Sequence, residues 1–247
     1  MLKKGSLFYF LFSLNAGVFF IGALMSCGKT DTATPTSSNV RLQVIQLSPN
    51  SYPVTLYMAN LRVGTSSFSY GNTPSYFYLP RTDTPLQIRI LRNLDTAYND
   101  RTKLLDNTRY TLFFLGLFGD ANGRSLQTLV TTDDAEELPP VGKGGKVRFL
   151  NGSPNANGSF DIWANGSPII KGIAFAKVSN FTTLPAGDYT FRVYQANTSV
   201  NSLGELANIT VQDGRLYTLY SRGLVGRAVT DTAAFTLSVV ANNPTVR

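Results

Sequence analysis

Few residue types in this chain could carry out chemistry. Of its 247 residues none is a histidine and one is a cysteine, while aspartate and glutamate together number 15. These counts exclude zinc sites built on histidine or cysteine clusters, Ser-His-Asp triads, Cys-His nucleophile pairs and an intrachain disulfide. Carboxylates and tyrosine hydroxyls are what remains for acid–base work or metal binding.

The densest group of carboxylates is the run Asp133-Asp134-Ala135-Glu136-Glu137. Oxygen ligands of this kind suit calcium, but the run lacks the glycine turn and the ligand spacing of a calcium loop. We interpret it as a solvated acidic linker. Asp161 alternates with Phe160 and Ile162, so we expect it on the solvent face of a strand. The sequence therefore predicts no enzymatic activity, no metal site and no cofactor.

The cysteine ends an N-terminal segment that is typical of an export signal. Lys3 and Lys4 precede an apolar run that leads to Leu24-Met25-Ser26-Cys27. A basic start, an apolar middle and a small residue before the cleavage point describe a secretory signal peptide. The last four residues resemble the lipobox of bacterial lipoproteins. That resemblance implies removal of residues 1–26 and a Cys27 that carries diacylglycerol and an acyl chain such as palmitate.

An uncleaved transmembrane helix is the alternative for this segment. The 19 residues from Leu7 to Met25 would nearly span a hydrocarbon core of roughly 30 Å. We favour the lipoprotein because the single cysteine stands where a lipobox requires it. Three acyl chains anchor a protein firmly, whereas one chain holds it only marginally. We therefore predict a lipid-anchored protein of the bacterial cell envelope, at the outer membrane, and leave open which side it faces.

Residues 27–39 are predicted to be the lipidated cysteine and a flexible tether. The segment is rich in threonine and serine and has no apolar periodicity. Fully extended, twelve residues reach about 40 Å. The formal charge of +7 falls to +5 once Lys3 and Lys4 are removed with the signal peptide. The remaining basic residues are spread along the chain, so the sequence does not predict nucleic-acid binding.

The rest of the chain repeats itself. Five landmarks return in the same order at offsets of 103 to 107 residues: Ser48-Pro49-Asn50 as Ser153-Pro154-Asn155, Leu79-Pro80 as Leu184-Pro185, Ile88-Arg89-Ile90 as Phe191-Arg192-Val193, Tyr110-Thr111-Leu112-Phe113 as Tyr217-Thr218-Leu219-Tyr220, and Gly116-Leu117-Phe118-Gly119 as Gly223-Leu224-Val225-Gly226. Such order indicates a duplication, and a period near 100 makes each copy a whole domain. Pro139-Pro140 and the glycines after them mark the boundary. We predict domains at 40–134 and 144–247, with a linker at 135–143.

Each copy is predicted to be built of seven or eight strands. Short apolar or alternating runs in the second copy cover residues 147–150, 160–164, 169–170, 180–184, 189–194, 206–211, 216–220 and 235–240. Asn165-Gly166 indicates a type I′ hairpin turn, and no window sustains a helical period. The pattern predicts an all-β chain of two tandem Ig-like β-sandwiches, with a small closed barrel as the alternative. In the first copy, Arg92–Asn107 is predicted to be a long polar loop segment.

Aromatic residues make up 12% of the chain and could serve a binding surface. Tyr52, Tyr70 and Tyr98 lie in or near expected loops, and rigid amphipathic rings stack well on sugars and on protein partners. We predict these three as ligand contacts. Aromatic side chains also fill sandwich cores, so Tyr76, the counterpart of Phe181, and Trp163 are interpreted as packing residues.

The order Ser-Pro-Asn, Leu-Pro-Ala-Gly-Asp-Tyr and Gly-x-x-Tyr-Thr-Leu resembles the family called "domain of unknown function 4397". The resemblance implies tandem β-sandwich modules on a bacterial envelope or secreted protein. The second copy fits better, because the first has Arg81-Thr82-Asp83-Thr84 in place of the Ala-Gly turn. The family has no established activity, so the resemblance supplies a fold and a location but no mechanism.

These observations predict a non-enzymatic binding or adhesion module that presents loops to a protein or glycan. The alternative is a structural or assembly accessory of an envelope complex on the periplasmic side. An enzyme that uses carboxylates or tyrosines alone is a third hypothesis. It is disfavoured because most residue types that supply a base near neutral pH are missing.

Overall fold

The computed structural model describes residues 38–72, 75–120, 124–134, 138–140, 142–154 and 158–242. The predicted signal peptide, Cys27 and most of the predicted tether lie outside these ranges. Within them the regular structure consists of strands. None of the described ranges forms a helix that is long and apolar enough to cross a bilayer.

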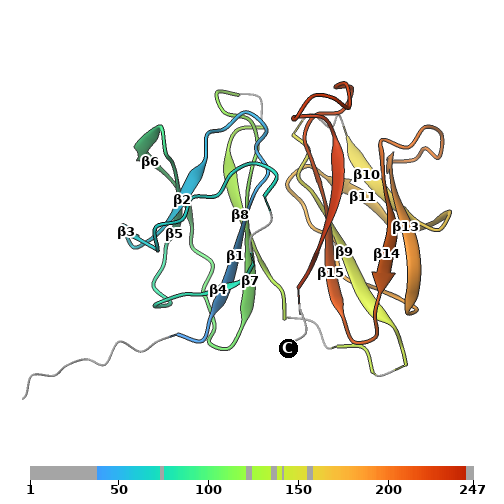
Figure 1. Cartoon of the computed structure of the whole chain (residues 1–247), viewed down its shortest axis with the longest axis horizontal. Coiled ribbons are helices and arrows are strands. Elements are labelled where there is room, and N and C mark those ends of the chain that lie inside the picture. Colours follow the sequence, from blue (N-terminus) through green and yellow to red (C-terminus); the bar gives the residue numbers. More distant parts are fainter. Residues whose placement is uncertain are drawn as a thin grey trace, which may run out of the picture. The chain divides into compact units, whose positions relative to one another are not determined.

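The first copy has two four-stranded sheets (Figure 1). One has the order β4-β1-β7-β8, with β1 at Arg41–Gln46, β4 at Phe77–Tyr78, β7 at Arg109–Leu115 and β8 at Gln127–Thr132. The other has the order β3-β2-β5-β6, with β2 at Val54–Met58, β3 at Leu61–Arg62, β5 at Leu86–Ile90 and β6 at Asn93–Asp100. Apolar side chains from both sheets form one buried core, so the sheets are packed face to face.

The second copy repeats this arrangement strand for strand. One sheet has the order β12-β9-β15-β16, with β9 at Gly145–Asn151, β12 at Thr182–Leu184, β15 at Leu216–Arg222 and β16 at Thr236–Ala241. The other has the order β11-β10-β13-β14, with β10 at Ser159–Ala164, β11 at Ser167–Ala174, β13 at Gly187–Gln195 and β14 at Gly204–Val211. The tandem β-sandwich prediction is therefore confirmed, and four separate sheets replace the closed-barrel alternative.

Period-two patterns position most of these strands. Val54, Leu56 and Met58 of β2 alternate into the first core. The Asn165-Gly166 turn that joins β10 to β11 has positive φ at both residues, 46° and 83°, as predicted.

Strand β7 is buried on both sides and has no such alternation. Leu112 and Phe114 belong to the first core, whereas Phe113 joins a separate cluster that includes Leu150 and Tyr220 of the second copy. The ring centroids of Phe113 and Tyr220 lie 6.2 Å apart. A continuous apolar strand is typical of a strand with both faces covered. The two copies therefore pack against each other through their equivalent sheets.

The contact between the copies joins equivalent residues. Ile45 is paired with Phe113 between β1 and β7, and Leu150 is paired with Tyr220 between β9 and β15. All four side chains lie in the cluster between the copies. A surface that meets its own counterpart in this way has the arrangement of a two-fold symmetric contact.

Each copy also contains a tyrosine that fastens the turn before β7 or β15. The Tyr110 hydroxyl accepts a hydrogen bond from the backbone N–H of Leu105 at 2.9 Å, and the Tyr217 hydroxyl accepts one from Gln212 at 3.1 Å. This is the geometry of the tyrosine corner of Ig-like sandwiches. The repeated Tyr-Thr-Leu landmark therefore has a structural role in both copies.

The sequence predictions for Asp161 and for the segment 92–107 are wrong. Asp161 is buried, because its carboxylate accepts hydrogen bonds from the backbone N–H groups of Gly172 at 2.7 Å and Asn197 at 3.2 Å. The pairing of β10 with β11 is irregular at this point, and the carboxylate there takes the place of a ladder partner. The polar segment 92–107 was predicted as a loop but contains β6, which pairs with β5 along one side.

Candidate ligand-binding groove

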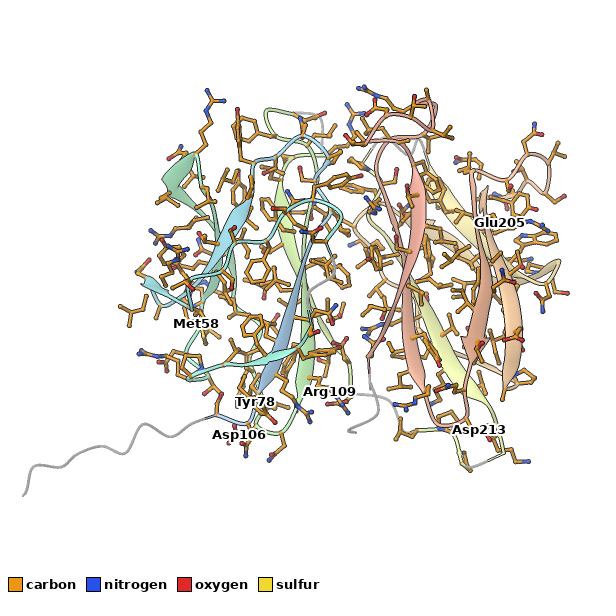
Figure 2. The ribbon with its side chains drawn as sticks, in the orientation of Figure 1. Met58, Tyr78, Asp106, Arg109, Glu205 and Asp213 are labelled. Atoms are coloured by element: carbon orange, nitrogen blue, oxygen red, sulfur yellow. The ribbon has the colours of Figure 1, made fainter. Side chains whose placement is uncertain are left out.

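A groove of about 720 Å³ opens on the first copy, beside β3 and β4. It is lined by Val63, Gly64, Thr65, Ser66, Ser67, Phe68, Ser75, Phe77, Tyr78 and Pro80. Since β3 and β4 are the outermost strands of their sheets, the groove lies at the open edge of the sandwich. Figure 2 shows Tyr78 on β4, at the end of the copy that also carries Asp106 and Arg109. The volume of the groove is within the range of about 300–1,000 Å³ that is usual for small-molecule sites.

The β3–β4 groove exists because β3 is short. β3 has two residues, whereas its counterpart β11 has eight and pairs with β10. Ile170 of β11 is buried in the second core, with Ile169 and Ile173 packed against it. In the first copy the chain after β3 reads Val63-Gly64-Thr65-Ser66-Ser67. Glycine and small hydroxyl side chains neither favour a strand nor fill the space of isoleucine, so this edge stays hollow.

Aromatic rings form the floor and the rim of the groove. Phe68 is 9% exposed and stacks on Phe77 with ring centroids 6.2 Å apart, and both rings pack in the first core. Two backbone hydrogen bonds with Val54, of 2.8 and 2.9 Å, hold Phe68 in place. Tyr78 is 65% exposed at the rim, and the guanidinium of Arg41 lies 5.9 Å from its ring centroid. The floor is therefore fixed by the core, while the rim presents a ring to solvent.

Four hydroxyl side chains line the rest of the groove. Those of Thr65, Ser66, Ser67 and Ser75 are exposed, and within the described part of the chain no other residue hydrogen-bonds to them. A hydroxyl can both donate and accept a hydrogen bond, and its hydrogen rotates to suit the partner. These groups are therefore available to water or to a ligand.

The lining of the groove carries no charge. Of the nearby cations, Arg62 donates to the carbonyl oxygen of Thr65 at 2.9 Å. Arg81 pairs with Asp83 at 3.4 Å, and both side chains are exposed, so this pair contributes little. The side chains that line the groove are thus apolar rings and free hydroxyls, and the guanidinium groups of Arg41 and Arg62 lie beside it.

The structure does not bring the three predicted tyrosine contacts together. Tyr52 lies in the β1–β2 loop, is 42% exposed and stacks with the guanidinium of Arg92 at 5.0 Å from the ring centroid. Tyr70 lies under Arg222 of the second copy, 5.2 Å from its ring centroid. Tyr98 lies in β6 and packs against the first core. Burial raises the pKa of Tyr70, which Arg222 opposes, and burial also raises the pKa of Tyr98.

Asp133 is fully buried, so its assignment to a solvated acidic linker is wrong. Its Oδ1 accepts a hydrogen bond from Nη2 of Arg148 at 2.5 Å. Its Oδ2 accepts from the hydroxyls of Tyr76 and Thr111, each at 2.7 Å. Burial raises the pKa of Asp133, an effect that Arg148, Thr111 and Tyr76 oppose. Burial and the neighbouring Asp133 raise the pKa of Tyr76 in turn.

Arg148 completes this buried polar cluster from the side of the second copy. Its Nε donates to the Thr218 hydroxyl at 2.9 Å, its Nη1 donates to the Thr132 carbonyl at 3.1 Å, and its guanidinium lies 4.7 Å from the Phe181 ring centroid. Tyr76, predicted as a packing residue, therefore meets its counterpart Phe181 across the same ion pair. The cluster is closed to solvent and holds the copies together rather than forming a site for a ligand.

The other predicted positions have simpler outcomes. Asp134 pairs with Arg109 at 2.7 Å, whereas Glu136 and Glu137 lie outside the described residues. Trp163 is partly buried and packs against Tyr194, with ring centroids 5.3 Å apart, as predicted. Cys27 also lies outside the described ranges. Among the residues that the structure describes, no three carboxylates or cysteines gather into a metal-binding group.

The repeated Ser-Pro-Asn landmark has a structural explanation. Asn50 donates from Nδ2 to the carbonyl of Phe118 at 3.1 Å and accepts from its N–H at 2.9 Å. In the second copy the Ser153 hydroxyl donates to the carbonyl of Gly223 at 2.7 Å. The landmark after β1 or β9 therefore binds the Gly-Leu-x-Gly landmark after β7 or β15.

Glycine is required at the first position of the Gly-Leu-x-Gly landmark. Gly116 has φ +107° and Gly223 has φ +77°. A Cβ at Gly116 would lie 2.3 Å from the carbonyl oxygen of Ser125, and one at Gly223 would lie 2.2 Å from that of Ala234. Only a residue without a side chain allows so close a backbone approach.

The family model described as "Domain of unknown function (DUF4397)" matches residues 38–157 and 145–246. The two matches together cover both β-sandwich copies. The chain belongs to this family. Three landmarks of this DUF4397 chain thus have structural roles. The Ser-Pro-Asn landmark binds the Gly-Leu-x-Gly landmark, the tyrosine of Tyr-Thr-Leu forms a tyrosine corner, and the first glycine of Gly-Leu-x-Gly allows a close backbone contact. A comparison of the DUF4397 chain with curated proteins finds no match.

Sequence reasoning missed the groove residues. Phe68, Phe77 and Tyr78 were not predicted as ligand contacts. Neither the single Phe68 between two serines nor the aromatic run Tyr76–Tyr78 has a pattern that distinguishes a groove ring from a core ring. A usable signal was the stretch Gly64–Ser67, which stands where the second copy has Ile170 and Ile173. Comparison of the two copies position by position would have predicted an unfilled edge.

Proposed function

We propose that this DUF4397 protein is a lipid-anchored module of the bacterial cell envelope that binds a ligand without altering it covalently. The β3–β4 groove carries the proposal, since its uncharged lining combines a fixed aromatic floor with free hydroxyls. Such a lining offers stacking and hydrogen bonding, which are the means of recognition rather than of proton transfer. The lining residues of the groove all belong to the first copy.

The proposed location at the cell envelope rests on the lipobox at Cys27 and on the contacts that fix the first described residues to the first copy. The Ser38 hydroxyl donates to the carbonyl of Leu79 at 2.8 Å, and the Asn39 N–H donates to Asp106 at 3.3 Å. Ten residues separate Cys27 from Ser38, and fully extended they reach about 35 Å. A body carried at that reach is free to meet a partner beyond the lipid headgroups.

A structural accessory on the periplasmic side is the second candidate. The observation in its favour is the contact between the copies, which combines an apolar cluster with the buried pair of Asp133 and Arg148. Two sandwiches fixed to each other make a stiff spacer, which suits an assembly role.

Two experiments test these proposals. Cys27→Ala is expected to move the protein from the detergent phase to the aqueous phase in a detergent phase separation. Unchanged partitioning would contradict lipid anchoring. Protease treatment of intact and lysed cells then distinguishes the candidates. Digestion of residues 38–242 on intact cells supports the binding module at the surface, and protection until lysis supports the periplasmic accessory.

A further inference from the structure

We propose that the ligand of the β3–β4 groove is a neutral carbohydrate chain, an inference that rests on the binding module proposed above. A pyranose ring has one face of C–H groups and an equatorial belt of hydroxyls. The groove offers the matching surfaces, because Phe68, Phe77 and Tyr78 supply apolar rings and the residues around them supply hydroxyls.

The free hydroxyls suit a sugar in particular. Thr65, Ser66, Ser67 and Ser75 can each donate and accept, so they pair with sugar hydroxyls in either direction. The exposed ring of Tyr78 is rigid and costs little conformational entropy when a ligand covers it. The floor residue Phe68 is already held by Val54 and needs no rearrangement.

The absence of charge from the lining argues against an anionic ligand. Phosphate and carboxylate groups are recognised by arginine forks or by lysine. The lining has neither. Of the two arginines beside it, Arg62 is directed to the Thr65 carbonyl and Arg41 lies over the Tyr78 ring. A neutral chain avoids the cost of removing a charge from water without a counterion.

The backbone at this edge argues against a peptide that binds by strand addition. That mode needs unpaired N–H and C=O groups on the outer strand. The outermost strands β3 and β4 have two residues each, which is too short for a peptide strand to pair with. Along β2 beyond β3 the backbone groups are occupied, since Val54 exchanges two hydrogen bonds with Phe68 and the carbonyl of Leu56 accepts from Val63. Recognition in the groove must therefore come from side chains.

The test is a titration of the detergent-solubilised full chain with cellohexaose, maltohexaose, laminarihexaose and chitohexaose, followed by calorimetry. The first variant is Tyr78→Thr, which installs the residue of the equivalent position, Thr183. The second is Ser66→Trp, which fills the groove from an exposed position. The matched control is Tyr52→Thr, which removes another exposed tyrosine away from the groove. Circular dichroism verifies that each variant is folded.

We expect at least one oligosaccharide to bind. Tyr78→Thr should weaken its affinity about tenfold, a loss of roughly 1.4 kcal/mol. Ser66→Trp should abolish binding, and Tyr52→Thr should leave it within about twofold of the parent. Because the ligand is neutral, the affinity should not change between 50 and 500 mM NaCl, roughly the range over which exposed charges become screened.

The opposite results separate this inference from the proposed function. Binding of a neutral proline-rich peptide that depends on Tyr78, with no oligosaccharide bound, would overturn the carbohydrate and retain the binding module. Oligosaccharide binding that is unaffected by Tyr78→Thr and Ser66→Trp would overturn the groove as its site. Failure of every neutral probe to bind would overturn both the carbohydrate and the groove, whereas the Cys27→Ala partitioning tests the anchor alone.

Discussion

The carboxylate of Asp133 and the guanidinium of Arg148 form an ion pair of 2.5 Å across the contact between the two copies. The side chains are 0% and 6% exposed, and each has further hydrogen-bond partners from its own copy. Removing one member of such a buried pair leaves the other charge without compensation, whereas replacing both can be nearly neutral. The pair therefore contributes more to the orientation of the two copies relative to each other than to the total free energy of unfolding.

Arg148→Gln is expected to lower the free energy of unfolding by about 3–5 kcal/mol, because Asp133 would remain buried without its counterion. The double variant Asp133→Asn with Arg148→Gln should recover most of that loss. It installs the neutral residues of the equivalent positions, Asn242 and Gln43, which are both buried. Urea unfolding of the parent and both variants provides the comparison. A double variant no more stable than Arg148→Gln would contradict this account.

The raised pKa of Tyr76 predicts that the protein loses stability in alkaline solution. The pKa of this tyrosine is raised above the ordinary value of 10.0, chiefly by burial and then by Asp133. Above pH 10 the phenol ionises in the unfolded chain but stays protonated in the folded one. The folded state then holds more protons, so stability falls as the pH rises, by about 1.4 kcal/mol per pH unit for this group. Tyr76→Phe should lessen that slope in urea unfolding measured from pH 9 to 11, and an unchanged slope would refute the prediction.

The two glycines of the Gly-Leu-x-Gly landmark should differ in their tolerance of alanine. Gly116→Ala is expected to cost more than about 3 kcal/mol, because its Cβ would overlap the Ser125 carbonyl as well as strain the backbone. Gly119 also has positive φ, but a Cβ there meets no atom within 4 Å. Gly119→Ala is the matched control and should cost about 1 kcal/mol. Equal losses in thermal or urea unfolding would argue that the close contact is unimportant.

Residues 144–247 expressed alone should fold, because the second copy has its own core, and should then self-associate. Separation exposes Leu150 and Tyr220, which pack against the first copy in the full chain. A newly exposed apolar patch of this kind favours pairing with a second copy of itself. Sedimentation velocity should show a dimer that Leu150→Lys converts to a monomer. A disordered amide spectrum would exclude independent folding.

Local patterns were sufficient to predict the duplication and most strands. The alternation of Val54, Leu56 and Met58 and the Asn165-Gly166 turn are properties of neighbouring residues, so a single sequence carries them. The contact between the copies also had a local signal. Leu112–Leu115 is apolar without alternation, and a strand of that kind requires cover on both faces.

The errors concern side chains whose partners are distant in the sequence. Asp133 looked solvated because Asp134 and Glu136 lie next to it, yet its donors Tyr76 and Thr111 come from separate parts of the first copy. Strand β6 was not predicted from the sequence, because it is an edge strand with polar side chains and shows no apolar alternation. The groove depends on an unfilled edge between two sheets, which no local pattern describes.

The symmetric contact has a consequence for how the two halves can diverge. In a dimer of two identical chains every substitution occurs twice, so a new acid on one side is always matched by the same acid on the other. Here positions 133 and 242 are separate sites of one gene and can change independently, and so can positions 43 and 148. Asp133 and Arg148 occupy one side of the contact, and their counterparts Asn242 and Gln43 occupy the other. Joining the halves in one gene frees each to specialise alone, and a cavity in one half where isoleucines fill the other is a difference that only such freedom permits.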